Sequence, residues 1–578
     1  MEVITQINTI ETNTSDLTDR AIELIKPNDV VPGAEIFTEN SDNRSLQHWP
    51  VSRHRSVQFW HEEPVEETTL GFPVVRPPHP MDRMKEGLKI RKSSSKDYPF
   101  VQEFGQHYDL VIIGGGLVGS MIAYFLTDRL EVRRGCKVAV VEKDLSYRRS
   151  LSTTSPLGLR MQHNLPETIE MSLYGSDFLR HLGRNLAIPF REIQDEDYFN
   201  VPNIKFQPNG HLTLASHGDM EKLATAHETQ KMSGVQCALL TAKQIKKRFP
   251  WIKIHNIEGG CLGLESEGWY DSWNLLQAIK LKNKHQGVDY INGEVIYMKK
   301  HLVDSMSSKT IYMGYNYDGS KVPIGRVYEA HMLLPDSQQV YPLHFSNCIL
   351  AGAGETGNLG RMCGIGDGHG PMGVEIPVER RRGYVFTVDT CGAGPGLNCP
   401  LTSDITGLYI RREGHAGQFS VGVIPDNNDE IPVNMFGDVH PDYWEHVVSP
   451  ILKDRFDGYV ICVKVQIQSP YVIVVCCRFD NAILVDSYPV DYDVNYFDGA
   501  PIIGPHPYMG NMWMACGFGG YGGSLAPAAG RALTELIYDN GYHTLDLSRL
   551  SFDRVLLGRG VTENSNRMFK SQEPARTF

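Results

Sequence analysis

The period of hydrophobic and polar positions changes near residue 107, where regular structure is expected to begin. Residues 107–180 predict strand, helix, strand, loop and helix, and residues 219–248 predict a helical stretch. Short strands and turns follow to about residue 440, and parallel-sheet patterns appear late, at 344–360 and 510–520. This interleaving predicts an α/β fold in which one nucleotide-binding domain is assembled from separate segments around an inserted antiparallel substrate domain.

Approximate bounds can be given to these segments. We expect the nucleotide-binding domain over residues 105–190, 259–372 and 497–545, and the substrate domain over 191–258 and 373–496. The substrate domain is therefore expected to be discontinuous as well.

Three regions fall outside this scheme. Residues 1–104 are rich in Pro, Ser, Thr and charge and predict a poorly ordered extension, and residues 546–578 form a C-terminal tail. Within the extension, 81–96 is a basic segment that suits either a solvated linker or a short helix on an anionic membrane surface. Residues 458–485, with their β-branched residues and neighbouring cysteines, interrupt the expected join, and we interpret them as inserted sequence.

The run YDLVIIGGGLVGSMIAYFL (108–126) carries the clearest chemistry. A strand precedes its glycines, an apolar helix follows them, and Glu142 closes a second apolar strand. This context predicts a dinucleotide-binding unit, with the diphosphate at the helix N-terminus and Glu142 on the adenosine ribose. FAD and NAD both fit that arrangement. The residues expected to contact the cofactor here are Gly114, Gly116, Leu117, Val118 and Gly119.

Two later glycine clusters favour FAD over NAD. The strand ending in ILAGAG (349–354) and the run CGFGGYGGSLAPAAGR (516–531), which opens a helix, would each bring backbone amides to a cofactor. A second helix N-terminus so far from the first suits the flavin and ribityl chain of FAD better than it suits NAD. The expected contacts are Ala351, Gly352, Ala353, Gly517, Gly519, Gly520 and Gly522.

Composition and charge narrow the remaining possibilities. The chain is 41% hydrophobic and 21% charged, as in soluble globular proteins, and its net charge of −12 argues against nucleic acid as a partner. Its histidines and 11 cysteines show no metal-ligand spacing, so no metal is expected, and the cysteines suit reduced core thiols. We expect neither a membrane-spanning helix nor an N-terminal signal peptide.

Together the three glycine motifs resemble those of the D-amino-acid oxidase and sarcosine oxidase group of flavoproteins. Longer strings narrow the resemblance to a subgroup of mitochondrial flavoproteins that take part in the assembly of respiratory complex I, and it covers most of residues 107–565. These strings are LPETIEMSLYGSDFLR (165–180), FPWI (249–252), ESEGWYDSWNLLQ (265–277), PVERRRGYVF (377–386), GLYIRREG (407–414), FDGAPIIGPHP (497–507) and LDLSRLSFDRVLLG (545–558).

The resemblance implies a Rossmann-type FAD-binding domain and a location on the matrix side of the mitochondrial inner membrane, with complex I subunits or assembly factors as partners. It also implies oxidation of an unidentified small amine or amino acid at a C–N bond. Two functional classes stay open: an FAD-dependent oxidoreductase, and a scaffold for complex I subunits that FAD only stabilises. An NAD-dependent dehydrogenase is a third, weaker option.

The resemblance also suggests residues near the flavin. Ser152, Thr153, Arg160 and Gln162 lie in the loop after Glu142, where the family places groups against the diphosphate and the isoalloxazine; a Ser/Thr-rich loop can also be only a helix cap.

Two further side chains are candidates for catalysis or substrate binding. Arg411 or its neighbour Arg412 suits a clamp for a substrate carboxylate, although a salt bridge with Glu413 is an equal alternative. Tyr521 stands where the family usually has histidine, which puts proton transfer at that position in doubt.

Overall fold

The computed structural model describes most of the chain from residue 107 onward. The expected extension 1–104, its basic segment 81–96, and nearly all of the suspected insert lie outside the described residues. The described residues are 107–128, 136–148, 150–156, 158–188, 202–301, 313–315, 321–367, 372–390, 395–414, 417–424, 439–456 and 483–562.

The first sheet is built mainly from parallel strands. Its order is β17-β18-β11-β1-β2-β6, and only the β17–β18 pair of this row is antiparallel. Its strands are β1 (His107–Ile113), β2 (Val138–Glu142), β6 (Asp289–Asn292), β11 (Val340–Leu350), β17 (Ile502–His506) and β18 (Met509–Cys516). Two further strands, β7 (Glu294–His301) and β10 (Arg326–Leu333), extend from β11 as an antiparallel ribbon, and β8 (Met313–Tyr315) pairs separately with β9 (Lys321–Pro323).

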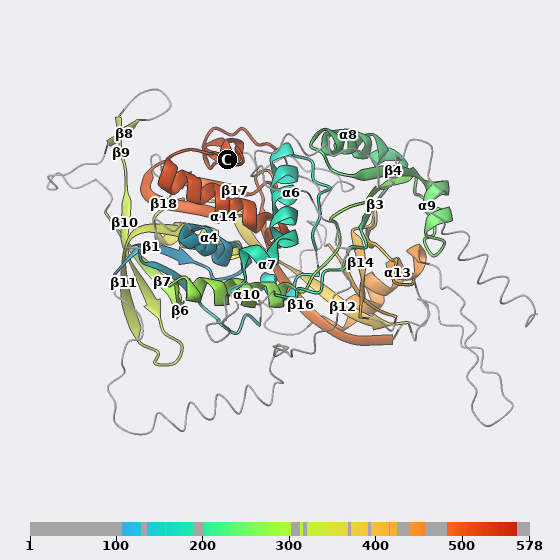
Figure 1. Cartoon of the computed structure of the whole chain (residues 1–578), viewed down its shortest axis with the longest axis horizontal. Helices are drawn as coiled ribbons and strands as arrows, with labels where there is room; N and C mark the ends of the chain where they lie inside the picture. The colour runs from blue at the N-terminus through green and yellow to red at the C-terminus, as the bar shows by residue number, and fades with distance from the viewer. Residues whose placement is uncertain are drawn as a thin grey trace, which may run out of the picture. The chain divides into compact units, whose positions relative to one another are not determined.

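Helix α4 (Leu117–Asp128) is central to this domain. It is apolar on nearly all sides and almost wholly buried, as expected for a helix enclosed by other elements. Helices α10 (Ser272–His285) and α14 (Gly522–Asp539) pack against it, and α14 also contacts α6 (Pro166–Arg180). Figure 1 shows α4 in blue beside α14 in red, although about 400 residues of sequence separate their N-termini.

Short helices complete the first domain. They are α5 (Leu151–Thr154), α7 (Leu182–Asn185), the 3₁₀ turn η3 (Ala353–Glu355), α11 (Thr356–Met362), the 3₁₀ turn η8 (Ser548–Leu550) and α15 (Asp553–Leu556). Among the residues that the structure describes, no helix combines the length and apolar character needed to cross a membrane.

The second sheet is largely antiparallel, in the order β16-β12-β15-β14-β13-β3-β5-β4; the β13–β3 pair is parallel. Its strands are β3 (His211–Ala215), β4 (Cys237–Thr241), β5 (Gly259–Gly263), β12 (Val378–Asp389), β13 (Leu401–Ser403), β14 (Leu408–Glu413), β15 (Gln418–Val423) and β16 (Ile483–Asn495). Its helical segments are η2 (His217–Asp219), α8 (Met220–Met232), α9 (Ala242–Arg248), α12 (Pro441–Tyr443), the π-helical turn η6 (Trp444–Val448) and α13 (Ser449–Arg455).

The two sheets confirm the predicted discontinuous α/β architecture, with two corrections. Strand β5 lies inside the predicted nucleotide-binding segment 259–372 but pairs with β3 and β4, so the substrate domain continues past residue 258. The predicted helix over 219–248 is wrong in its middle, because Gly234 adopts φ +88° after α8 and the apolar residues that follow form β4.

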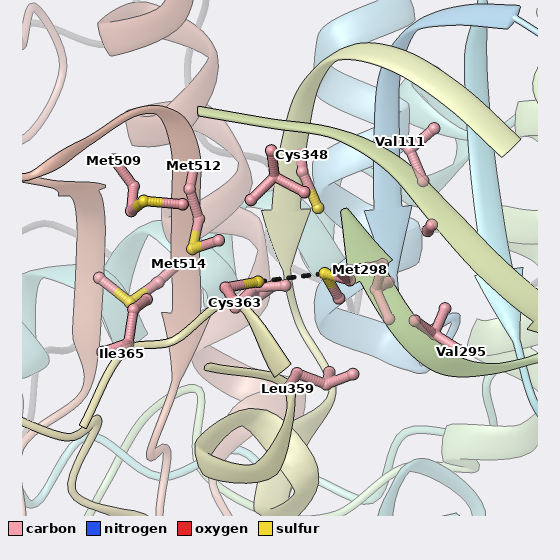
Figure 2. Packing of buried hydrophobic residues seen from close by; sticks show 14 of the residues in the cluster. Val111, Val295, Met298, Cys348, Leu359, Cys363, Ile365, Met509, Met512 and Met514 are labelled. Carbon is pink, nitrogen blue, oxygen red and sulfur yellow. Dashed lines mark hydrogen bonds between the residues drawn. The ribbon is translucent and has the colours of Figure 1, made fainter. Parts of the chain in front are cut away.

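The core of the first domain is rich in sulfur. Figure 2 shows Met298 of β7, Cys348 of β11, Cys363 after α11 and three methionines of β18 converging in one cluster, with Cys363 Sγ 3.1 Å from Met298 Sδ. Flexible thioethers fill irregular gaps between elements that are distant in sequence. The cluster therefore ties the late strand β18 to the earlier part of the domain. Six of the seven described cysteines are buried, consistent with core thiols.

Candidate active site

The turn between β1 and α4 can be formed only with glycine at two positions. Gly114 has φ +107°, and a Cβ atom there would lie 2.2 Å from the carbonyl oxygen of Ala351. A Cβ on Gly119 would lie 1.9 Å from the carbonyl oxygen of Gly114. The first contact joins the carboxyl ends of β1 and β11, and the second packs α4 on its own turn, as a dinucleotide-binding unit requires.

The expected third-strand contacts continue from Ala351. The N–H of Ala351 donates to Ile113, Gly352 precedes the η3 turn, and Ala353 opens that turn with a φ of +49°. Gly354 lies so close to β12 that a Cβ would come 2.6 Å from Cα of Arg380. Residues 351–354 therefore lie between the end of β1 and the second sheet.

Ser152 closes the other side of the turn. Its hydroxyl accepts a hydrogen bond from the N–H of Leu117 at 2.8 Å, and a Cβ on Gly116 would lie 2.8 Å from the same oxygen. Thr153 instead donates to the carbonyl oxygens of Tyr147 and Ser150, so its hydroxyl stabilises its own loop. Contact of Ser152 with a phosphate stays a prediction.

Glu142 is held at the end of β2 by the neighbouring backbone. One carboxylate oxygen accepts from the N–H of Gly115 at 2.8 Å and the other from the N–H of Asp144 at 3.1 Å. Burial raises the pKa of this carboxyl above its ordinary value. The Tyr147 hydroxyl is buried beside Gly115 and has no hydrogen-bond partner among the described residues. It could therefore form a hydrogen bond with a ribose bound next to Glu142.

The N-terminus of α14 lies directly beside that of α4. A Cβ on Gly522 would contact Val118 Cγ2 at 3.2 Å, and one on Gly523 would contact Leu117 Cδ1 at 3.3 Å. Two helix N-termini with glycine-rich approaches therefore meet, and the positive end of each helix dipole favours anionic ligand atoms. The predicted joining of the first and third glycine motifs is thus present in the fold.

The glycine turn before α14 has an internal anchor that the sequence did not reveal. Gly517, Gly519 and Gly520 all have positive φ, and a buried Asp493 of β16 accepts from the N–H of Phe518 at 2.9 Å. The N–H of Gly519 donates to the Asp493 carbonyl oxygen. The N–H groups of Phe518 and Gly519 therefore donate to Asp493. Contacts of Gly517, Gly519 and Gly520 with the flavin stay predictions.

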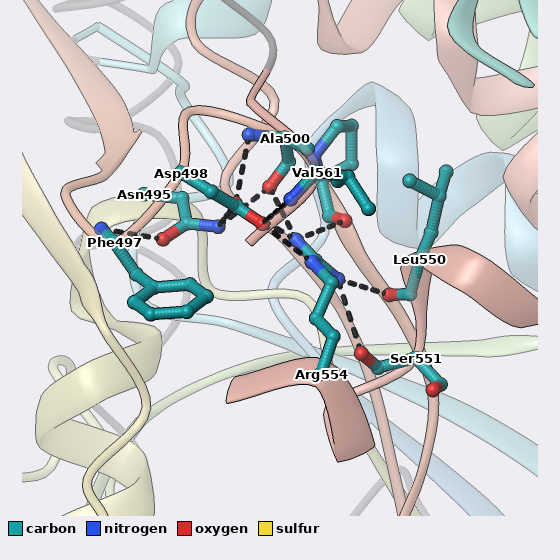
Figure 3. A network of polar contacts seen from close by, with 9 residues as sticks. Asn495, Phe497, Asp498, Ala500, Leu550, Ser551, Arg554 and Val561 are labelled. Carbon is teal, nitrogen blue, oxygen red and sulfur yellow. Dashed lines mark hydrogen bonds and ion pairs between the residues drawn. The ribbon is translucent and has the colours of Figure 1, made fainter. Parts of the chain in front are cut away.

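The loop that follows β16 is fixed by a buried ion pair. Arg554 donates to both carboxylate oxygens of Asp498, at 2.7 and 3.1 Å, and also to the carbonyl oxygens of Leu550, Ser551, Ala500 and Pro501. Figure 3 shows Asn495 donating to Asp498 in the same network. The segment around Arg554 thereby holds the loop that leads from β16 to β17.

Arg160 and Tyr521 join two segments of the site. Arg160 is buried, and its Nη1 donates to the Tyr521 hydroxyl across 2.6 Å. The His163 ring meets the Tyr521 ring edge-on at a centroid distance of 5.4 Å. Because Tyr521 immediately precedes α14, this cluster lies at the helix N-terminus where the flavin is expected.

Gln162 connects the same loop to the second sheet. Its amide nitrogen donates to the carbonyl oxygen of His211 at 2.8 Å and to Glu267 Oε2 at 2.9 Å, while its amide oxygen accepts from Thr213. Glu267 is fully buried and also accepts from the N–H of Met161. Burial raises the pKa of Glu267 to about 7. Gln162 thus orients the loop, and its contact with the flavin stays a prediction.

Arg411 makes the salt bridge that was the alternative to a carboxylate clamp. Its Nη2 lies 2.6 Å and its Nε 2.9 Å from Glu413 Oε1, which also accepts from Ser420. Arg412 points to the opposite face of the strand, as alternation requires. A clamp by Arg411 stays a prediction, and it would require the pair with Glu413 to open.

Sequence comparison defines the class of protein. A family model described as FAD dependent oxidoreductase matches residues 109–536. A protein from Xenopus laevis, FAD-dependent oxidoreductase domain-containing protein 1, is 34% identical over 448 residues, covering 77% of this chain and 82% of the relative. A Drosophila melanogaster homolog of that protein is 34% identical over 476 residues, covering 82% and 84%. The chain belongs to the FAD-dependent oxidoreductase family.

Solved structures confirm the fold. L-proline dehydrogenase from P. horikoshii superposes with a TM-score of 0.57 at 18% identity, covering 79% of this chain and all of that chain. Glycine oxidase from Geobacillus kaustophilus gives 0.53 at 16% identity, covering 77% and 98%.

FAD is the cofactor of this family, and the residues present fit it. The Gly114 turn has no room for a side chain, two helix N-termini meet beside Val118, and the Tyr147 hydroxyl is a buried donor next to Glu142 that has no partner among the described residues. The first two features come from the glycine motifs at 114–119 and 517–522, and the contact between Gly114 and Ala351 adds the motif at 349–354.

Proposed function

We propose that this protein is an FAD-dependent oxidoreductase that acts on the C–N bond of a small amine bearing a carboxylate. The observation that carries the proposal is the buried pair of Arg160 and Tyr521, which lies at the N-terminus of α14 and is tied to the second sheet through Gln162. With FAD bound at that helix N-terminus, as proposed, the pair would supply a cation and a phenol beside the flavin.

Names of similar proteins support this chemistry. The solved structures with this fold include a proline dehydrogenase and a glycine oxidase. A curated relative from Paenarthrobacter nicotinovorans, 23% identical over 448 residues and covering 75% of this chain and 44% of the relative, is a 4-methylaminobutanoate oxidase. All three names refer to amino acids or amino-acid analogues.

Bound FAD supplies a hydride acceptor for the carbon next to the substrate nitrogen. The chain's own residues then have to bind and orient the substrate. Arg160 supplies positive charge for a carboxylate, and Tyr521 fixes the guanidinium. The face of the second sheet that carries Thr213 and Tyr409 borders this cluster, so side chains from that sheet define which substrates fit.

We further propose that the protein works on the matrix side of the mitochondrial inner membrane and contributes to complex I assembly. This part rests on the sequence strings shared with that subgroup of flavoproteins, and its partners would be complex I subunits or assembly factors. The basic segment 81–96 is the part of the chain proposed to contact the membrane.

The test is anaerobic mixing of the FAD-loaded protein with primary and secondary amino acids while the oxidised flavin band is followed. Bleaching by at least one compound supports the proposal. No bleaching across the set, together with co-purification of complex I subunits, supports the second candidate function, a scaffold that FAD stabilises. The closed Arg411–Glu413 pair is the observation that favours this alternative.

A further inference from the structure

His211, at the start of β3, has an unusual pattern of hydrogen bonds. Its side chain is buried, and its Nε2 lies 2.9 Å from the hydroxyl oxygen of Ser403. Its Nδ1 is buried without a hydrogen-bond partner among the described residues. Buried polar atoms without partners are rare and carry a free-energy cost, so this nitrogen is a candidate for binding a ligand.

The register of the second sheet places His211 on the face that borders the loop carrying Arg160. Ser403 lies opposite both Thr213 of β3 and Tyr409 of β14. Because side chains two residues apart share a face, His211, Thr213, Tyr409 and Arg411 all lie on that one face. The bond from Thr213 to Gln162 shows that it is the face turned toward the Arg160 loop.

The surroundings of His211 are predominantly cationic. Burial lowers the pKa of His211 well below its ordinary value, and Arg160 and His163 of the loop lower it further. Glu267, the acid nearest this loop, is bonded to Gln162 and Met161, and Arg411 on the same face is paired with Glu413. The imidazole of His211 is therefore neutral and by itself does not repel an ammonium group. The positive charge of Arg160 still disfavours an ammonium group at this position.

We propose that Nδ1 of His211 binds the carboxylate of the substrate and takes up one proton from solvent as it does so. An anion that arrives between Arg160 and His211 screens the guanidinium and stabilises the imidazolium, so binding and protonation favour each other. The only covalent change in this step is the transfer of one proton from a solvent oxygen to Nδ1; no heavy-atom bond forms or breaks. The inference rests on the proposed function and adds to it that His211 contacts the substrate carboxylate and couples its binding to proton uptake.

The probe is acetate, which has a carboxylate and no oxidisable amine. Titration calorimetry of the oxidised, FAD-loaded protein in buffers of different ionisation enthalpy measures both acetate affinity and proton uptake between pH 6 and 8.5. We expect proton uptake that increases toward one per acetate as pH is lowered, and a Kd that falls by up to tenfold for each unit by which pH is lowered. Ethylammonium chloride serves as the control salt and should not bind.

The key variant is His211→Gln, which keeps a polar group near Ser403 but cannot titrate. We expect it to lose proton uptake and the pH dependence of Kd, with acetate bound at least fivefold more weakly at pH 6. His227→Gln, a half-buried histidine on α8, is the matched control and should behave like the native protein. Flavin content and the unfolding midpoint of both variants establish that they are folded.

Two results would overturn the inference: acetate that does not bind the native protein, or proton uptake that persists in His211→Gln. Neither depends on turnover, so they are separate from failure of the proposed function, which would appear as a flavin that no amine reduces. Proton-coupled acetate binding without any flavin reduction would support the carboxylate site at His211 and contradict the proposed oxidation of amines.

Discussion

Arg160 donates a hydrogen bond to the hydroxyl of Tyr521 across 2.6 Å, joining residues 361 positions apart in the sequence. One belongs to the loop after β2 and the other immediately precedes α14. Substitution Tyr521→Phe should therefore remove a hydrogen bond to a buried cation and destabilise the protein by about 1.5–3 kcal/mol. Urea unfolding of the FAD-loaded protein measures this loss.

Tyr270→Phe is the matched control for that substitution. The Tyr270 side chain is buried, and its hydroxyl makes no hydrogen bond among the described residues, so its removal should change stability by less than about 1 kcal/mol. Equal losses in the two variants would contradict the importance of the Arg160–Tyr521 bond.

Gly114→Ala should abolish tight FAD binding. The new methyl group would lie 2.2 Å from the carbonyl oxygen of Ala351, and the backbone would be strained at φ +107°. We expect protein purified with less than about a tenth of the native flavin content, because β1 and β11 must separate. Gly541→Ala, where a Cβ meets nothing within 4 Å, should retain native flavin content.

Arg554→Met should destabilise the protein by about 3–5 kcal/mol, because it leaves the buried carboxylate of Asp498 without its cation. Arg549→Met provides a comparison, since Arg549 pairs with Glu167 but is 57% exposed, and its loss should cost at most about 1 kcal/mol. Chemical denaturation of both variants checks this difference, and similar losses would show that the network in Figure 3 is not an anchor.

Glu267 should make stability fall as pH rises. Burial raises its pKa from 4.5 to about 7 in the folded state, so the folded protein holds this proton more tightly than the unfolded chain does. The resulting stabilisation is complete below about pH 4.5 and is lost as pH rises through about 7, an effect of up to about 3 kcal/mol. The measurement is the fall in unfolding free energy between pH 5 and pH 8. This fall should be larger in the native protein than in Glu267→Gln by up to about 3 kcal/mol. An equal fall in both proteins would show that Glu267 does not have a raised pKa.

The dinucleotide-binding unit could be predicted from sequence because its signals are local. Gly114, Gly119 and Glu142 lie within 29 residues, and each position has its own steric or hydrogen-bonding reason. The late motif at 517–522 could be joined to it because a glycine run before a helix has few other uses. The structure places these motifs together through Val118 and Gly522.

The polar residues of the site could not be predicted in the same way. Asp493, Glu267 and His211 are single residues whose partners lie far along the chain, for example 105 residues from Gln162 to Glu267. No spacing rule marks such residues, because strand pairing alone brings them to the site. Strand β4 was missed for a different reason: Ser233 and Gly234 were a usable signal for the end of a helix.

The most direct test of the central claim is to quantify the product of a single turnover. The FAD-loaded protein is mixed anaerobically with an amino acid that bleaches the flavin, and the carbonyl compound released after hydrolysis is measured. Oxidation at a C–N bond predicts one carbonyl product for each flavin reduced. Flavin reduction without a carbonyl product, or a flavin that no amino acid reduces, would contradict the account.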